Sequence, residues 1–254
     1  MTSRVWGAAL HPLSLLLYLL VAWEAVSRTG LVSPSLLPPA SKVLTVLAEL
    51  LQRPAVWKAI GVTASEVVIA FLIAMPTGIL IGVFLAENRY WGAVLKPFFN
   101  FLFSIPKSIF LPMFILTIGI GIPQKISFGV FSMIFIVVIS VSVAVESVRG
   151  SHILVARCYG ATRRQVFSHV YLPSMLPAIL ETMRLGMIFN FTGVILAEMY
   201  VSRLGIGNLI GTWGENYQLP QLLAGIMMVS AAAIAFNEAI RAVEKRYGHW
   251  RSAE

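Results

Sequence analysis

The feature that most limits the fold of this chain is a series of long apolar stretches that very few charges interrupt. Residues 126–145, ISFGVFSMIFIVVISVSVAV, form the clearest of them. About twenty apolar residues are what a helix needs to cross the hydrocarbon of a bilayer. Strands of transmembrane barrels instead alternate apolar and polar residues in short segments, and this stretch does not. The sequence therefore predicts an all-α, polytopic membrane protein.

Such stretches recur along the whole chain, in which 58% of the residues are hydrophobic and only 12% are charged. We expect about six transmembrane helices in a single domain that covers residues 1–254. The first stretch resembles a signal peptide, but Trp23 and Glu24 at its end and the later spans favour an uncleaved helix. The predicted spans are residues 10–26, 62–86, 98–120, 126–148, 178–199 and 222–240.

Prolines separate the first span from an amphipathic helix that begins at Ser41. Pro38 and Pro39 in tandem cannot continue a helix, and from Ser41 onward the apolar residues follow one helical face. This helix either lies on the membrane surface or packs against the protein itself. In the second span, Gly78 and Gly82 are four residues apart, a spacing that lets two helices approach closely in lipid.

The third span contains a break, SIPKSIFLP, at residues 104–112. Pro106 and Pro112 each remove a backbone donor, and irregular backbone survives at membrane depth only where protein or a water-filled cavity satisfies it. Lys107 adds a charge, which either reaches a nearby membrane interface or contacts substrate. Further along, GIGIPQK, residues 119–125, predicts a tight turn, and the glycine-rich residues 201–220 predict a loop.

Residues 149–177 form a polar segment between two apolar spans. Gly160 lies between two short helical patterns and allows a sharp corner there. Pro173 and Pro177 are predicted to separate the second short helix from the fifth span. We therefore expect a helix–turn–helix hairpin at the inner face of the membrane. Its basic, exposed side could receive another protein. Alternatively, the segment is a solvated loop that is basic only because cytoplasmic loops carry an excess of lysine and arginine.

The distribution of lysine and arginine predicts which side of the chain faces the cytoplasm, because short cytoplasmic loops carry an excess of both. With six spans, eleven of these residues lie on the side of the polar segment and both termini, and six lie on the other side. We expect that first side to be cytoplasmic, and the net charge of +8 to reflect this anchoring rather than nucleic-acid binding. The eleven are Arg4, Arg89, Lys96, Arg149, Arg157, Arg163, Arg164, Arg241, Lys245, Arg246 and Arg251, and the six are Arg28, Lys42, Arg53, Lys58, Lys125 and Arg203.

Motifs that would make the chain an enzyme are absent from the sequence. It has no G-x-x-x-x-G-K-[ST] phosphate loop, so it is not expected to hydrolyse ATP alone. Its carboxylates form no obvious acid–base pair, and the single Cys158 has no cysteine partner for a metal site, so we predict neither catalytic residues nor metal ligands. The sequence is also compatible with a stand-alone ion-coupled carrier or channel, because Glu66 and Lys107 lie in apolar surroundings.

The polar segment resembles the docking loop of ATP-binding-cassette (ABC) importer permeases. In that family the loop reads E-A-A, three residues, G, nine residues and then I-x-L-P. This chain has Leu154-Val155-Ala156, Gly160 and Val170-Tyr171-Leu172-Pro173 at the same spacing. The segments LLPPASKVL, IPKSIFLPMFILTIGIG, AEM at 197–199 and LGIGNLI at 204–210 resemble the nitrate, sulfonate and taurine branch in particular. Leu154 stands where the family has a glutamate that helps fix the loop in a cleft of the ATPase.

The resemblance covers about residues 36–248 and implies a type I ABC importer permease fold, multi-pass in a bacterial inner membrane. It implies a homodimer of permease copies, cytosolic ATPase subunits that carry the ATP and magnesium, and a periplasmic or lipid-anchored substrate-binding protein. The chain itself is expected to bind no cofactor. The branch handles nitrate, sulfonates, taurine, bicarbonate and, as an alternative, vitamin-precursor pyrimidines. The docking residues carried over are Ala156, Arg157, Gly160, Ala161, Arg163, Arg164, Leu172 and Pro173, and those suggested for the translocation pathway are Lys107, Arg184, Asn190 and Glu198.

Overall fold

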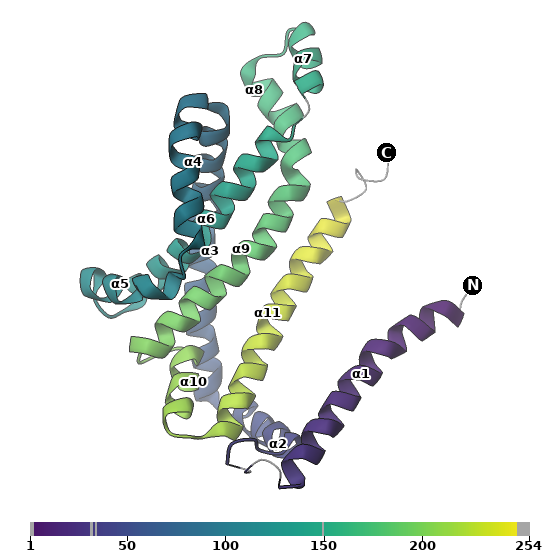
Figure 1. The fold of residues 1–254 in the computed structure, drawn as a ribbon, viewed down its shortest axis with the longest axis vertical. Helices are drawn as coiled ribbons and strands as arrows, with labels where there is room; N and C mark the ends of the chain where they lie inside the picture. Colours follow the sequence, from purple (N-terminus) through teal and green to yellow (C-terminus); the bar gives the residue numbers. More distant parts are fainter. Residues whose placement is uncertain (1–2, 31–32, 34, 149, 248–254) are drawn as a thin grey trace.

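The computed structural model describes residues 3–30, 33, 35–148 and 150–247, without the side chains of residues 3–13, 16, 151, 163 and 243–247. This part of the chain is helical, and its long helices run along the length of the molecule (Figure 1). The elements are α1 (Ser3–Arg28), α2 (Ala40–Leu51), α3 (Pro54–Glu87), α4 (Arg89–Ser104), η1 (Lys107–Phe110), α5 (Leu111–Ile118), α6 (Ile122–Glu146), α7 (Gly150–Cys158), α8 (Arg163–Val166), η2 (Phe167–Tyr171), α9 (Leu172–Val201), α10 (Ile206–Glu215) and α11 (Leu219–Tyr247).

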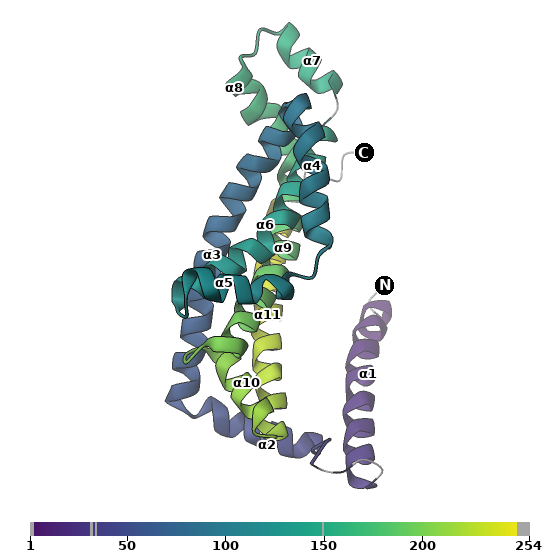
Figure 2. The same ribbon diagram turned by 60° about the vertical axis from the view of Figure 1, so that its left-hand side comes forward.

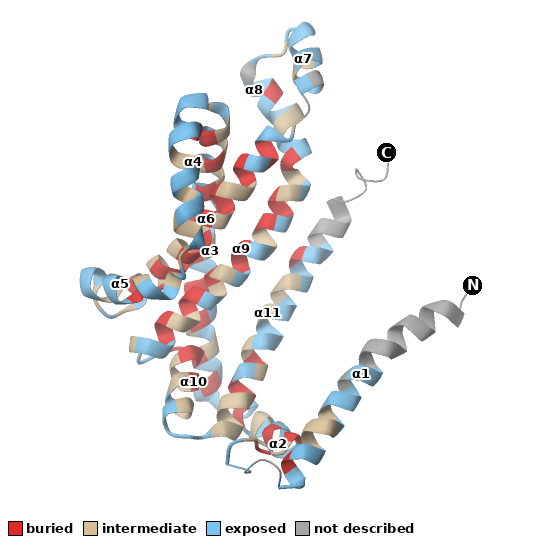
Figure 3. Cartoon of the chain, in the orientation of Figure 1, coloured by how far each residue is buried: buried red, intermediate tan, exposed pale blue. Residues whose placement is uncertain are grey.

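The centre of the bundle is α6, which packs between α3 and α9. In its most apolar stretch 61% of the residues are buried, against 17% for α11, so α6 is enclosed by protein and α11 lies at the periphery (Figure 3). The main core beside α6 joins residues of α3, α6 and α9. It consists of Ala74, Met75, Met133, Val137, Val141, Ala144, Val145, Met175 and Ile179.

The close approach of α3 to α6 depends on Gly78 and Gly82, the pair whose spacing predicted such a contact. A β-carbon on Gly78 would lie 2.6 Å from Cγ1 of Val137, and one on Gly82 would lie 2.9 Å from the backbone oxygen of Val138. Both distances are shorter than real contacts of a β-carbon. Any side chain at either position therefore forces the two helices apart.

Gly82→Ala is expected to destabilise the protein, because the added methyl group meets backbone that has no room to move. Overpacking of this kind costs about 1–3 kcal/mol. Gly61→Ala in the same helix is the matched control, since nothing lies within 4 Å of a β-carbon there. Thermal unfolding of the two variants in detergent compares them, and equal midpoints would contradict the proposed close contact.

Four helices of the described part are long and apolar enough to cross a membrane, or five if a bent pair counts as one span. Four predicted spans correspond to α3, α6, α11 and the continuous helix Arg164–Val201. The third predicted span is the bent pair, in which α4 and the segment Lys107–Ile118 meet at 93°. The first predicted span falls in α1, but some side chains of this helix are not among those that the structure describes. α1 diverges from the bundle and contacts α2 (Figure 2).

The amphipathic helix α2 packs against the protein, which was one of the two placements left open by the sequence. Val43 and Leu50 are buried in a cluster with Ile206 and Ile210 of α10 and with residues of α11. The carboxylate of Glu24 in α1 accepts a hydrogen bond from the backbone N–H of Ser41 at 3.0 Å. α2 is thus fixed at one end of the bundle between α1 and the helices α10 and α11.

Two predictions about loops were wrong. The glycine-rich residues 201–220 contain the helix α10, and GIGIPQK is not wholly a turn, because α6 already begins at Ile122. In α10 the glycines allow close packing: a β-carbon on Gly207 would lie 2.8 Å from the backbone oxygen of Ile195 in α9. Tertiary packing therefore overrides the poor helix propensity of glycine. The turn is confined to residues 119–121 and begins at Gly119, whose φ of 85° suits glycine.

Candidate docking hairpin and buried polar network

The polar segment folds into a helical hairpin whose corner is Gly160. Its φ of +78° is left-handed, a region that glycine enters without steric cost. The backbone N–H of Gly160 donates to the oxygen of Arg157 at 2.9 Å, and that of Ala161 donates to the oxygen of Ala156 at 3.0 Å. These two bonds form a Schellman motif, which ends α7. The predicted corner is confirmed, with its hydrogen bonds defined.

The next helix starts with a capping box that the sequence analysis did not identify. The backbone N–H of Thr162 donates to Oε1 of Gln165 at 2.8 Å, and the backbone N–H of Gln165 donates to Oγ1 of Thr162 at 3.3 Å. The pattern Thr-x-x-Gln is the known sequence signal for this motif. The Schellman motif and the capping box lie back to back, so the corner between α7 and α8 has little freedom to change its angle.

The predicted break at Pro173 and Pro177 was wrong, because one helix runs continuously from Arg164 to Val201. Just before Pro173 the helix widens into a π-helical turn, Phe167–Tyr171, in which the N–H of Leu172 donates to the oxygen of Phe167. A π turn shifts the backbone carbonyls that a proline ring would otherwise meet. The hairpin is therefore a direct extension of the fifth predicted span.

The hairpin presents most of its predicted docking residues at the surface. Arg157, Gly160, Arg164, Leu172 and Pro173 are exposed, and Ala156 and Ala161 are half-buried. Arg163 lies in α8, but its side chain lies outside the described residues. Figure 1 places α7 and α8 at one end of the molecule. Contact with an ATPase stays a prediction for all of these residues.

A cleft of about 910 Å³ separates the hairpin from the end of α3. Exposed basic side chains reach it from the hairpin, and one carboxylate reaches it from α3. Its lining consists of Val83, Ala86 and Glu87 from α3, and of Arg157, Ala161, Arg164, Val166, Phe167 and Tyr171 from the hairpin. Because it is open and partly polar, this cleft could receive a segment of another protein.

Within the bundle, Glu66 of α3 and Lys125 of α6 form a buried ion pair. The side chain of Glu66 is fully buried and that of Lys125 is 4% exposed. Lys125 also donates to Oγ of Ser202 at 3.1 Å. The sequence analysis placed Lys125 in a loop facing the outside, and the structure corrects this. The pair ties α3 to α6 at the end of the bundle opposite the hairpin.

Glu198 of α9 extends this network to the N-terminus of α10. Its carboxylate accepts the hydroxyl proton of Thr63 at 2.7 Å and the backbone N–H of Gly207 at 2.8 Å. Oγ1 of Thr63 accepts the backbone N–H of Ile206 at 2.9 Å. A β-carbon on Gly205, whose φ is +106°, would lie 1.9 Å from the Glu198 carboxylate. The AEM and LGIG segments therefore meet at one buried contact.

The other predicted pathway residues are also engaged within the chain. Asn190 is fully buried and donates to the backbone oxygen of Val67 at 2.8 Å, so it holds α9 against α3. Arg184 is half-buried on α9. Nζ of Lys107 donates to the backbone oxygens of Leu102, Phe103 and Ile105 at 3.1, 2.6 and 2.9 Å. Lys107 thus satisfies carbonyls left free at the end of α4, a role that neither sequence interpretation included. Substrate contact by any of these side chains stays a prediction.

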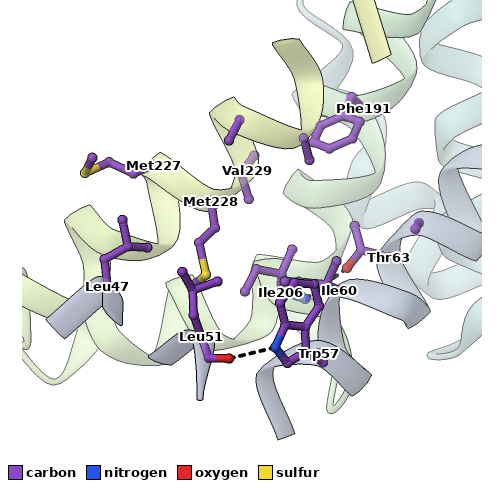
Figure 4. Close-up of a pocket in the computed structure, with 13 residues that line it drawn as sticks. Leu47, Leu51, Trp57, Ile60, Thr63, Phe191, Ile206, Met227, Met228 and Val229 are labelled. Carbon is purple, nitrogen blue, oxygen red and sulfur yellow. Dashed lines mark hydrogen bonds between the residues drawn. The ribbon is translucent and has the colours of Figure 1, made fainter. Parts of the chain in front are cut away.

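A separate groove of about 400 Å³ lies among α2, α3, α9, α10 and α11 (Figure 4). Trp57 lies beside it, with its indole N–H donating to the backbone oxygen of Leu51 at 2.8 Å. The one hydroxyl in its lining, that of Thr63, is already donated to Glu198. A groove with this lining suits hydrocarbon rather than a small anion, since burying a charge without a partner is costly.

Solved structures of ABC transporters share this fold. A chain of a bacterial alginate ABC transporter, in complex with an alginate-pentasaccharide-bound periplasmic protein, aligns with a TM-score of 0.63 over 96% of both chains, at 17% identity. A chain of the MetNI methionine ABC transporter aligns with a TM-score of 0.55 over 74% of this chain and 94% of its own, at 21% identity. These alignments show that the chain has the fold of type I ABC importer permeases.

The family within that class follows from sequence comparison. The profile of the binding-protein-dependent transport system inner membrane components matches residues 78–249, more than half of the chain. The chain therefore belongs to this family. As members of an ABC importer class that depends on a binding protein, such permeases work with ATPase subunits and a substrate-binding protein. The chain is accordingly a transport permease subunit.

Several named permeases are similar to this chain along most of their length. The taurine transport system permease protein TauC of Escherichia coli (strain K12) is 27% identical over 91% of this chain and 86% of its own. The nitrate import permease protein NrtB of Synechocystis sp. is 23% identical over 92% and 88%. The formylaminopyrimidine transport permease protein ThiX of Halalkalibacterium halodurans is 24% identical over 97% and 98%.

Proposed function

We propose that this permease subunit imports a small polar or anionic solute, such as taurine, another sulfonate or nitrate, at the expense of ATP hydrolysed by a partner. The observation that carries the proposal is the α7–α8 hairpin. It lies at the tip of a transmembrane bundle and turns at Gly160, the residue that matches the hinge of the family's docking loop. ATP-driven movement of cytosolic subunits would reach the spans through the continuous helix Arg164–Val201.

The proposed orientation places the hairpin in the cytoplasm. The turn between α3 and α4, the end of α6, the hairpin and the far end of α11 all lie at the same end of the molecule (Figure 1). Arg89, Arg157 and Arg164 lie at that end. The burial of Lys125 removes one basic residue from the loops of the other end, which strengthens the asymmetry of charge. Of the residues behind the proposal that both termini are cytoplasmic, Arg149 and Arg251 lie outside the described residues, as do the side chains of Arg4, Lys245 and Arg246.

The proposed complex contains two copies of this chain, two cytosolic ATPase subunits and a substrate-binding protein. Support for a second copy comes from the family resemblance and from the lightly buried α11. The substrate class rests on the relatives, since taurine and nitrate are both small and carry negatively charged oxygens. A pyrimidine is the second candidate, because the formylaminopyrimidine permease matches nearly the whole chain.

Reconstitution tests both the mechanism and the substrate. Proteoliposomes that contain the full chain, its ATPase subunit and its binding protein are expected to accumulate labelled taurine or nitrate only when ATP reaches the ATPase. Excess unlabelled taurine, nitrate and formylaminopyrimidine, added one at a time, identify the substrate by competition. Accumulation by the chain alone, driven by an ion gradient, would instead establish a secondary carrier.

A further inference from the structure

The α7 helix of the hairpin exposes an apolar face that nothing else in the described chain covers. Leu154 is 65% exposed, Val155 is 55% exposed and Tyr159, just after the helix, is 89% exposed. Val155 and Tyr159 are four residues apart and so lie on one face, with Leu154 and the exposed Cys158 beside them. Large apolar side chains gathered at an exposed surface mark interaction sites.

The position of this face argues against burial in the membrane. The helix that carries the hairpin, Arg164–Val201, has 38 residues and is about 57 Å long, against about 30 Å of hydrocarbon. If the apolar span begins at Ala178, as the sequence predicts, Arg164 lies about 21 Å further along the helix. A tilt of about 40° would still leave roughly 16 Å, and the headgroup layer takes up only about 5–8 Å. The hairpin therefore reaches water, where an apolar face favours a protein partner.

The charge of the hairpin indicates which kind of protein partner fits this apolar face. The hairpin carries exposed Arg157 and Arg164, and no acidic residue occurs between Glu146 and Glu181. A second copy of this chain would bring its own basic hairpin and repel this one. A partner with carboxylates around an apolar recess is complementary in both respects. Both arginines line the open cleft beside α3, where such carboxylates could enter.

We propose that Leu154, Val155 and Tyr159 form an apolar docking surface for the ATPase subunit, which supplies a complementary apolar recess with acidic groups at its rim. This inference rests on the proposed function and adds the chemistry of the contact. In place of the glutamate typical of the family, Leu154 contributes buried apolar area. The partner of this chain is therefore expected to differ at this site from ATPases that receive a glutamate.

Leu154→Glu, which restores the family's residue, tests the chemistry directly. The full chain is co-expressed with the ATPase subunit of the same transporter and purified in detergent through a tag on the chain. Because Leu154 is exposed, the variant is expected to fold, yet to retain about tenfold less ATPase, as loss of a central interface contact would cause. Leu154→Met is the matched control, and it should stay within about twofold of the native ratio.

The outcomes separate this inference from the proposed function. If Leu154→Glu retains as much ATPase as the native chain, the contact is not apolar, while docking itself stands. If the native chain retains no ATPase, docking fails and the apolar surface fails with it. Retention by the native chain and Leu154→Met, but not by Leu154→Glu, supports both.

Cys158, the one cysteine of the chain, tells a protein partner from a lipid surface. In inside-out vesicles that contain phosphatidylglycerol and lack the ATPase, a water-soluble maleimide should label Cys158 rapidly. Added ATPase subunit should protect it, and Leu154→Glu should abolish the protection. Slow labelling before the ATPase is added would place this face in the bilayer or on the other side of the membrane. Either case would overturn the proposal.

Discussion

Lys125→Met should lower the free energy of unfolding by about 3–5 kcal/mol, because it leaves a buried charge without its partner. Apart from the ion pair with Lys125, neither carboxylate oxygen of Glu66 has a hydrogen-bond partner among the described residues. The neighbouring Glu198 is also acidic and brings no positive charge that could replace the lysine. Thermal unfolding in detergent, followed by circular dichroism or size-exclusion chromatography, measures the loss.

Two controls show whether burial of the charge is the cause. Lys96→Met breaks the pair with Glu146, whose side chains are 27% and 52% exposed, and should cost no more than about 1 kcal/mol. The double variant Glu66→Met/Lys125→Met replaces the buried pair by apolar groups and should recover most of the stability lost in Lys125→Met. A double variant as unstable as Lys125→Met would show that the lysine acts through something other than this pair.

This ion pair also marks where prediction from the sequence stops. The start of α6 could have been predicted from the sequence, because proline is favoured in the first turn of a helix and Pro123 lies there. That signal would have moved Lys125 from a turn into a helix. Its burial could not be predicted, because Glu66 is 59 residues away and nothing local shows which helices pack together. The same applies to Glu198, whose partners lie on α3 and α10.

The sequence analysis predicted a break in the helix at both Pro106 and Pro173, but the structure has a break only at Pro106. At Pro106 the helix does break, since Ile105 adopts extended backbone with ψ of 133° and Lys107 satisfies the carbonyls left free. At Pro173 the helix continues, because the π turn before it adjusts the backbone. Proline excludes one particular hydrogen bond and one close contact, and the surrounding turn decides whether the helix tolerates that loss.

The hairpin was the most predictable part of the candidate site. Its corner follows from glycine alone, but its second boundary does not, because the helix from Arg164 continues past Pro173 and Pro177. The capping box of Thr162 and Gln165 could also have been predicted, because Thr-x-x-Gln is a local sequence signal. Leu154 is exposed to water because the long helix Arg164–Val201 carries the hairpin beyond the membrane. The predicted break at Pro173 implied a shorter helix.

Gly160→Val is expected to abolish ATP-driven uptake while leaving the transmembrane bundle folded. Valine at φ of +78° is strained, at a cost of more than the roughly 1–2 kcal/mol of an ordinary residue, since its side chain is branched at the β-carbon. Relief of that strain breaks the two hydrogen bonds that close α7 and changes the angle between α7 and α8. The docking surface then no longer points at its partner. Uptake in the reconstituted system and ATPase retained on the tagged chain measure the two effects.

A clash with other parts of the chain cannot account for such a loss, because nothing lies within 4 Å of a β-carbon on Gly160. Gly150→Ala is the matched control: this position is also open, at the start of the same short helix, and does not have the left-handed φ of Gly160. It should leave uptake unchanged, and Gly160→Ala should fall between the two. Normal uptake by Gly160→Val would mean that the corner does not transmit force from the ATPase. An equal loss in Gly150→Ala would mean that glycine serves some purpose in this hairpin other than its left-handed turn.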